Sequence, residues 1–373
     1  MKNKIITIIA IILAFLAGGE LTYILLNGGS KSETIENGNE TSQVYNSCSN
    51  CMSGTTVVEN GGISRSVSKA YDSVVMVKGY KNNRLTGSGS GFVYKKDDNY
   101  GYIMTNQHVV DGTTSLKIKF ASGEEVEGTL LGGDKYIDIA VIKVPIKYVI
   151  SVAKIGSTEN LALGETVFAI GTPVSEDYFN SVTGGYVSGL NRQVSVSVDA
   201  TADWIQDVIQ VDVSINPGNS GGPLLNFNGE VIGVTSLKLI NNSIEGMGFA
   251  IKIEDAMKHI DKLEKSTKIV RPLLGINYVD VTDSYTLRRY GITLDSSITE
   301  GVVIVNIIEK SGAENAGLQK GDVIVKIGND KVSSIAHLKY ILFKHDVGET
   351  IKVTYIRGNA TKTTEVTLTA NDD

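Results

Sequence analysis

Short apolar runs alternate with turn residues between positions 63 and 250. The runs are rich in Val, Ile and Thr, and Gly, Asn and Asp punctuate them. These residue types are typical of strands and turns, and repeated short strands favour an all-β barrel or sandwich over βαβ units. The predicted strands include residues 73–80, 89–94, 101–106, 115–120 and 137–144.

The hydrophobic period changes after this region. Apolar residues recur at intervals of three and four over residues 252–265, which predicts a helix that closes the β-rich part. A second, α+β unit is predicted beyond the boundary at 268–272. Its helix should cover 335–344 with Ser333 or Ser334 as the cap. Its predicted strands are residues 301–308, 322–327, 351–357 and 363–369.

An almost uninterrupted apolar segment covers residues 5–26. As a helix it would be about 33 Å long, enough for a hydrocarbon core of ~30 Å. Lys2 and Lys4 precede it and acidic residues follow it, so the positive-inside rule predicts a cytoplasmic N-terminus with the rest of the chain outside. A cleaved signal peptide, with its small-residue site at 17–19, is the alternative. Both interpretations place the folded domains outside the cytoplasm, and we favour the uncleaved anchor.

Residues 28–62 are rich in Gly, Ser, Asn, Thr and Glu, which predicts a flexible linker. Both cysteines of the chain, Cys48 and Cys51, lie there. Two cysteines provide no disulfide framework, and a zinc site would lack two ligands, so we expect a local disulfide or two thiols without a role. No metal site and no cofactor are predicted. The formal net charge of −6 leaves no basic stripe for nucleic acid.

The segment Asn-Pro-Gly-Asn-Ser-Gly-Gly-Pro at 216–223 carries the clearest chemical signal. A serine hydroxyl becomes a nucleophile when a base removes its proton and N–H groups stabilise the oxyanion. Neighbouring glycines allow the backbone to bend so that the N–H groups of Gly218 and Ser220 converge. We therefore predict Ser220 as the nucleophile, in an oxyanion turn made of Gly218, Asn219 and Ser220.

The same residues satisfy G-x-S-x-G, the nucleophile elbow of α/β-hydrolases. That motif requires a helix directly after the serine, whereas two apolar runs joined by Asn228-Gly229, a hairpin signal, follow here. The base would also have to come from downstream of the serine, where every histidine lies in a helical segment or in the C-terminal unit. The elbow interpretation therefore fails.

His108 is the candidate base, since it alone of the four histidines lies within the β-rich region. It follows the predicted strand 101–106 and precedes a short turn. The third member should be a carboxylate that fixes the tautomer of the imidazole. Asp138 heads an apolar strand and is predicted for this role, because Asp111 lies too near His108 in a turn and Asp134 lies in a Gly-Gly-Asp loop.

With these residues in the order His, Asp, Ser, the chain resembles the HtrA/DegP family of trypsin-like serine proteases. The resemblance extends from residue 87 to the C-terminus and rests on 87–92, 105–109, 138–143, 210–225 and the C-terminal unit. It implies a chymotrypsin-like double β-barrel, a homotrimer, and ATP-independent cleavage of misfolded extracytoplasmic proteins.

The resemblance also implies further site residues. Arg192 matches the sensor-loop arginine of the family. Ser214 stands where an acidic residue would confer specificity for basic side chains, so that specificity is not expected. The implied S1 pocket would take small aliphatic side chains and would be lined by Thr235, Ser236 and Leu237.

The C-terminal unit resembles a PDZ domain, on the segments 271–276 and 316–324. In such domains a glycine-containing loop offers backbone N–H groups to a peptide carboxylate, while the peptide adds a strand to a sheet edge. The predicted carboxylate loop consists of Leu273, Leu274, Gly275 and Ile276.

The predicted fold is mainly β, with a double-barrel protease domain followed by an α+β PDZ domain. The predicted function is a serine endopeptidase for the quality control of unfolded proteins, which are its partners together with C-terminal peptides. A membrane-tethered chaperone or scaffold with secondary proteolysis is the alternative, and fluorophosphonate labelling of Ser220 would separate the two. The predicted regions are a cytoplasmic stub with the anchor (1–27), the linker (28–62), the protease domain (63–268) and the PDZ domain (270–373).

Overall fold

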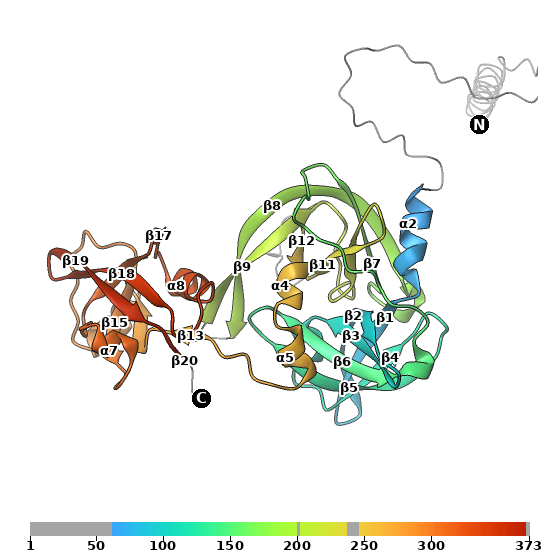
Figure 1. Ribbon diagram of the computed structural model, residues 1–373, viewed down its shortest axis with the longest axis horizontal. Helices are drawn as coiled ribbons and strands as arrows, with labels where there is room; N and C mark the ends of the chain where they lie inside the picture. The colour runs from blue at the N-terminus through green and yellow to red at the C-terminus, as the bar shows by residue number, and fades with distance from the viewer. Residues whose placement is uncertain (1–61, 200–201, 237–245, 371–373) are drawn as a thin grey trace, which may run out of the picture. The chain divides into compact units, whose positions relative to one another are not determined.

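The computed structural model describes residues 62–199, 202–236 and 246–370 (Figure 1). The predicted membrane segment and both cysteines lie outside these residues. Within the described ranges, no helix has the length and apolar character needed to cross a bilayer. The described chain forms two closed β-barrels followed by an α+β domain, which confirms the predicted fold class for this part of the protein.

The first barrel has the strand order β1-β2-β3-β6-β5-β4. Alternate residues of its strands, such as Val75 and Val77, point inward and are fully buried. The five strands predicted here all exist, and β5 was not predicted. The elements are β1 Val74–Lys81, β2 Arg84–Lys96, β3 Tyr100–Thr105, α3 Gln107–Val110, β4 Ser115–Lys119, β5 Glu125–Asp134, β6 Ile139–Pro145 and the 3₁₀ helix η1 Ile146–Tyr148.

The second barrel has the strand order β10-β11-β12-β9-β8-β7. The hairpin that Asn228-Gly229 predicted is the turn between β10 and β11, which pair antiparallel. The elements are β7 Thr166–Gly171, the 3₁₀ helix η2 Glu176–Tyr178, β8 Ser181–Asp199, β9 Ala202–Val211, β10 Pro223–Asn226, β11 Val231–Thr235 and β12 Gly248–Lys252.

A shared apolar core joins the two barrels. Phe92 and Met104 of the first barrel pack in one buried cluster with Phe168, Ile170 and Leu225 of the second. Burial of each such side chain stabilises the folded state by roughly 1.5–3 kcal/mol, and this burial holds the two barrels together. This packing therefore also fixes the relative positions of chain segments from the two barrels that lie next to each other.

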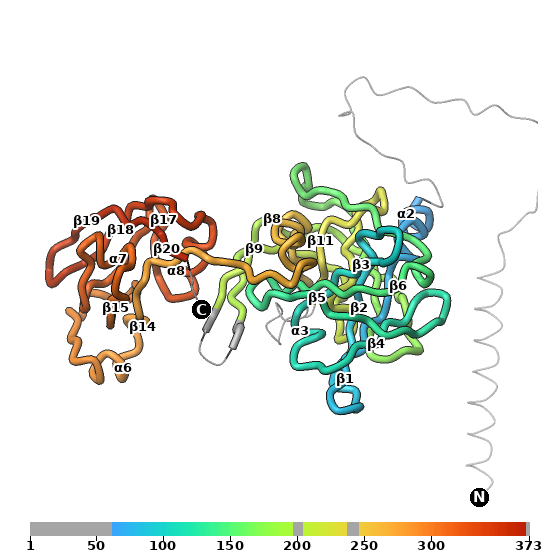
Figure 2. Tube along the Cα trace, turned by 60° about the horizontal axis from the view of Figure 1, so that its bottom comes forward, coloured from blue at the N-terminus to red at the C-terminus, as the bar shows by residue number. Residues whose placement is uncertain are grey.

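Three short helices lie on the outside of the barrels. The predicted helix over 252–265 is instead two helices, α4 (Ile253–Met257) and α5 (Ile260–Glu264), with His259 between them. Helix α4 contacts β11 and α5 contacts β5, so the pair connects both barrels (labelled in Figure 1, with a second view of the trace in Figure 2). The break lets each helix bury its own apolar side. Helix α2 (Gly62–Tyr71) was not predicted, and Ser66 donates a hydrogen bond from it to the Phe227 carbonyl.

The C-terminal domain is built on an antiparallel sheet with the order β14-β15-β16-β18-β19, in which β17 pairs with β16. Its separate core includes Leu338 and Ile341 of α8. The predicted strands and helix are confirmed, and Ser334 caps α8 by accepting from the His337 N–H. The elements are β13 Pro272–Leu273, β14 Ile276–Asp280, α6 Ser284–Arg289, β15 Val302–Ile307, α7 Gly312–Asn315, β16 Val323–Ile327, β17 Asp330–Lys331, α8 Ile335–Leu342, β18 Thr350–Arg357, β19 Ala360–Thr367 and β20 Thr369–Ala370.

Candidate active site

His108 and Asp138 are hydrogen-bonded through both the imidazole ring and the backbone of His108. His108 lies in α3, directly after β3, and Asp138 lies in the turn between β5 and β6. The imidazole Nδ1 is 2.8 Å from Asp138 Oδ2, and the His108 backbone N–H donates to Asp138 Oδ1 at 3.0 Å. The Asp138 side chain is 3% exposed and the imidazole 30%. A buried carboxylate on Nδ1 sets the orientation of the ring and presents Nε2 on the opposite edge.

The backbone of Asp138 is held as firmly as its carboxylate. Its φ of 54° lies in the left-handed region, which Asp tolerates better than most residues. The Asp138 carbonyl accepts from the Gln107 N–H at 3.2 Å and from Asn106 Nδ2 at 2.8 Å. These bonds tie the β5–β6 turn to the residues on either side of the β3–α3 junction, so the two halves of the pair move together.

The other two candidate carboxylates have different surroundings. Asp134 accepts from Arg271 Nη2 at 2.7 Å and from the N–H groups of Tyr136 and Ile137. Asp111 is the exposed residue that ends α3. Asp138 is therefore the carboxylate that the structure places on the imidazole.

The predicted nucleophile lies in a tight turn before β10. The Asn219 N–H donates to the Asn216 carbonyl at 3.0 Å, with Gly218 at a φ of 104° inside the turn. A Cβ on Gly218 would lie 2.1 Å from the Thr172 carbonyl oxygen, so no other residue fits there. Ser220 follows with 5% of its surface exposed.

A close approach at Gly89 of β2 brings the histidine helix and the nucleophile turn to one place. A Cβ on Gly89 would lie 2.6 Å from a methyl of Val109, the neighbour of His108 in α3. It would also lie 2.9 Å from the carbonyl oxygen of Ser220. Both predicted catalytic segments therefore contact the same point of β2, one from each barrel.

Two residues assigned to the S1 pocket take part in this assembly. The Ser236 hydroxyl, fully buried, donates to Asp138 Oδ2 at 3.1 Å. The Thr235 hydroxyl donates to the Asn219 carbonyl at 2.7 Å. Both hydroxyls thus bind the predicted catalytic segments, which the sequence did not reveal, and Leu237 lies outside the described residues. The only sequence feature that could have indicated these contacts is the position of two polar residues at the end of an apolar strand.

Two family models match the chain. The model of the trypsin-like peptidase domain matches residues 89–234, and the model of the PDZ domain matches residues 272–368. The serine protease Do-like HtrA of Lactococcus lactis subsp. cremoris is 34% identical to the chain, over 92% of this chain and 92% of that protein. The chain belongs to the HtrA family of serine proteases.

Other relatives and solved structures agree with this assignment. The serine protease Do-like HtrA of Bacillus subtilis is 38% identical over 77% of this chain and 65% of its own length. The crystal structure of the serine endoprotease from Yersinia pestis is 27% identical, with a TM-score of 0.61 over 83% of this chain and 98% of that chain. The HtrA-type protease AlgW with a tripeptide is 25% identical, with a TM-score of 0.61 and the same coverage. The chain is thus an HtrA-type serine protease with a PDZ domain.

The predicted carboxylate loop of this HtrA-family PDZ domain leads into β14, the edge strand of the sheet. Gly275 has a φ of 82°, and a Cβ there would lie 2.1 Å from the Cβ of Ser311. Leu274 and Ile276 on either side are buried. A cavity of about 680 Å³ adjoins the loop. Leu338 and Leu342 of α8 line part of it, and Asp134, Lys135 and Arg271 from outside the C-terminal domain line another part. A strand at the end of a sheet, such as β14, is the element to which a peptide adds in this mode of binding.

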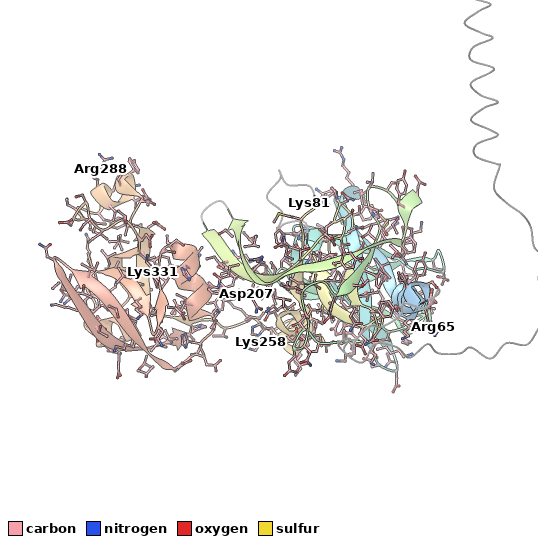
Figure 3. All side chains as sticks on the ribbon, turned by 90° about the horizontal axis from the view of Figure 1, so that it is seen from above. Arg65, Lys81, Asp207, Lys258, Arg288 and Lys331 are labelled. Atoms are coloured by element: carbon pink, nitrogen blue, oxygen red, sulfur yellow. The ribbon has the colours of Figure 1, made fainter. Side chains whose placement is uncertain are left out.

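Two further residues, on β8 and β9, make side-chain hydrogen bonds in this HtrA-family protein. Arg192, the predicted sensor-loop arginine, lies on β8 and donates from Nε to Gln210 Oε1 of β9 at 3.1 Å. Asp207 of β9, labelled in Figure 3, accepts from the hydroxyl of Tyr340 in α8 at 2.6 Å. Sequence reasoning missed the Asp207–Tyr340 contact, because its partners are 133 residues apart.

Proposed function

We propose that the chain hydrolyses internal peptide bonds with Ser220 as the nucleophile, His108 as the general base and Asp138 as the group that orients His108. The double hydrogen bond between His108 and the buried Asp138 carboxylate carries this proposal. A solvated surface pair would not hold a histidine through both its backbone and its ring. The order of the three residues along the chain and the glycine-rich turn around Ser220 support it.

The arrangement accounts for each step of acyl transfer. His108 Nε2 takes the proton of the Ser220 hydroxyl while its oxygen attacks the carbonyl carbon of the scissile bond. The N–H groups of Gly218 and Ser220 stabilise the oxyanion of the tetrahedral intermediate. His108 then returns the proton to the leaving amine as the C–N bond breaks. His108 then deprotonates a water that attacks the carbonyl carbon of the acyl-enzyme, and it passes this proton to the Ser220 oxygen as the ester bond breaks.

The proposed substrates are unfolded or damaged polypeptides, cleaved without ATP, as the family resemblance implies. The PDZ domain supports this choice, because the edge strand β14 can pair with an extended chain and not with a folded surface. We extend the proposal to small aliphatic side chains in the S1 pocket. Chain assembly as a homotrimer is also proposed, and light scattering of the purified protein tests it.

Hydrolysis of casein by the full-length chain tests the nucleophile. Ser220→Ala should lower kcat by about 10⁶-fold, and His108→Ala should cost nearly as much, because such residues act as a unit. Ser88→Ala, an exposed serine on β2, serves as the control and should retain full activity. Retention of a tenth of the activity by Ser220→Ala would end the serine-protease assignment of this residue.

We place the folded domains outside the cytoplasm, anchored by residues 5–26. The motivation is the apolar length of this segment and the two lysines before it. Protease added to intact cells should digest the PDZ domain, and alkaline carbonate should leave the protein in the membrane fraction. Full-length chain recovered from the cytosol would contradict this topology.

A further inference from the structure

Ser90 of β2 is a buried serine for which the reaction above has no role. Its side chain is fully buried, although it belongs to the first barrel and the nucleophile turn precedes a strand of the second. Its backbone N–H donates to the Ser220 carbonyl at 2.8 Å, and its carbonyl accepts from the Thr105 hydroxyl at 2.7 Å. The position of Ser90 relative to the nucleophile is therefore fixed by backbone contacts.

The hydroxyl of Ser90 connects two segments that flank the oxyanion turn. Its Oγ lies 2.9 Å from the Thr172 backbone nitrogen and 2.7 Å from the Gly218 carbonyl oxygen. The Thr172 N–H can only donate, so Oγ accepts this bond. The Gly218 carbonyl can only accept, so it receives the single proton of the hydroxyl. The direction of both hydrogen bonds is thus determined by the chemistry of the partners.

The Gly218 N–H belongs to the preceding peptide, that of Pro217 and Gly218, which a separate bond restrains. The Pro217 carbonyl accepts from the Val174 N–H at 2.8 Å, and the described backbone has no cis peptide bond. In a trans peptide the N–H points opposite to the carbonyl, so this contact directs the Gly218 N–H away from Val174. The next carbonyl, that of Gly218 itself, is held by Ser90. Glycine has little torsional preference of its own, so these outside contacts select its orientation.

The segment 172–174, whose Val174 N–H holds the Pro217 carbonyl, is itself strained. Val174 has a φ of 64°, a conformation that is unfavourable for a β-branched residue. The Ser175 N–H donates to the Pro173 carbonyl at 2.7 Å, which closes a three-residue turn around Val174. Strain of this kind persists only where surrounding contacts maintain it, and it gathers at functional sites. Ser90 is one of those contacts, through Thr172.

We propose that Ser90 is a positioning residue for the oxyanion hole. Its hydroxyl couples the segment 172–174 to the nucleophile turn and keeps the Gly218 N–H directed at the oxygen of the scissile carbonyl. This inference rests on the proposed function, since it assigns a support to the same oxyanion turn.

A matched pair of esters tests the proposal on the full-length protein. N-acetyl-alanine methyl ester develops an oxyanion, whereas its thionoester develops charge on sulfur, which is a weak hydrogen-bond acceptor. Loss of an oxyanion-hole donor costs about 10²–10³ in kcat, so loss of its support in Ser90→Ala should lower kcat/KM for the oxoester by about 10–100-fold. The thionoester rate should stay within about twofold. Fluorophosphonate labelling, which also develops negative charge on oxygen, should slow by a factor similar to that for the oxoester.

Ser73→Ala is the control. Ser73 is also fully buried, and its hydroxyl donates to the Ala70 carbonyl at 2.5 Å, so this variant also loses a buried, hydrogen-bonded hydroxyl. It should lower the melting temperature as Ser90→Ala does, without changing the ratio of the two ester rates. Equal losses on both esters in Ser90→Ala, or no loss on either together with unchanged labelling, would overturn the positioning role. A fluorophosphonate adduct on a residue other than Ser220 would instead overturn the proposed function.

Discussion

Three donors converge on the Asp138 carboxylate: the ring and the backbone N–H of His108, and the hydroxyl of Ser236. Oδ2 receives two of them, with Ser236 at 3.1 Å and His108 Nδ1 at 2.8 Å. A hydrogen bond to a charged group contributes about 1.5–3 kcal/mol, more than one between neutral groups. Ser236 therefore helps to hold the carboxylate in the plane where it orients the imidazole.

Ser236→Ala should lower kcat by about tenfold and leave KM unchanged, because the carboxylate keeps both contacts to His108 but loses one restraint. Steady-state kinetics on a peptide with an alanine before the scissile bond measures both constants, and Ser73→Ala again controls for a lost buried hydroxyl. A rise in KM or a changed preference for the P1 side chain, at constant kcat, would show that Ser236 lines the S1 pocket instead.

At the scale of elements, an ion-pair group ties η2 to the first barrel. Lys78 of β1 is buried and pairs with Glu125 of β5 at 2.5 Å and with Glu176 of η2. Lys119 of β4 lies 3.0 Å from Glu176. Since η2 follows the strained segment 172–174, these pairs hold that segment against the barrel.

The contribution of these ion pairs to the stability of the fold depends on pH. The hydrogen bond from Lys78 lowers the pKa of both Glu125 and Glu176 below the usual 4.5. Burial opposes the charge of Lys78, but its two carboxylate partners outweigh this effect and raise the pKa of Lys78 above 10.5. The carboxylates thus stabilise the fold above about pH 4.5, and this contribution is lost as the pH falls through their lowered pKa values. The contribution of Lys78 is present below its usual pKa and is lost in alkali.

Lys78→Met should therefore make the free energy of unfolding depend less steeply on pH below about 4.5, because the two carboxylates return toward their ordinary pKa. Urea denaturation between pH 3 and 7 measures the slope. Lys81→Met removes the same charge from an exposed position on the same strand and should leave the slope unchanged (Figure 3). An identical slope for wild type and Lys78→Met would show that the carboxylates are already hydrated in the folded protein.

At the scale of the whole molecule, the PDZ domain adds a peptide site to the protease. The loop 273–276 leads into the edge strand β14, and the adjoining cavity is lined in part by α8. A terminal carboxylate bound by several N–H groups makes charge-assisted hydrogen bonds, each contributing roughly 1.5–3 kcal/mol. A peptide that lacks the negative charge should lose at least one of them.

Amidation of a peptide that ends in Val or Phe should thus weaken its binding by about tenfold or more, since 1.4 kcal/mol corresponds to one decade. Calorimetric titration of the full chain with Ser220→Ala measures both affinities without cleavage. Gly275→Ala should weaken the binding of the free-acid peptide, because the new methyl would clash with Ser311. Gly358 also has a positive φ, but a methyl there would meet no neighbour, so Gly358→Ala should leave the affinity unchanged. Equal affinities for the two peptides would leave internal segments as the ligands of this domain.

The sequence by itself determined what depends on neighbouring residues. Short runs of Val, Ile and Thr between turn residues predicted β1 to β4 and β6, helical spacing together with a cap predicted α8, and the glycine-rich turn predicted Ser220 as the nucleophile. The order of residue types predicted His108 and Asp138, which the structure places in contact. Each of these signals lies within a few positions of the residue it concerns, so local stereochemistry and residue type were sufficient.

Only the tertiary structure decided which distant groups meet. Ser236 reaches Asp138 across 98 residues, and Ser90 reaches Gly218 across 128. The break between α4 and α5 and the presence of α2 likewise depend on the barrel surfaces that these helices cover. A strand pattern shows which side of the strand is buried, but it does not show which residue of another barrel lies opposite. Barrel closure and the packing between the barrels set that pairing, and with it the contacts that support the predicted catalytic residues.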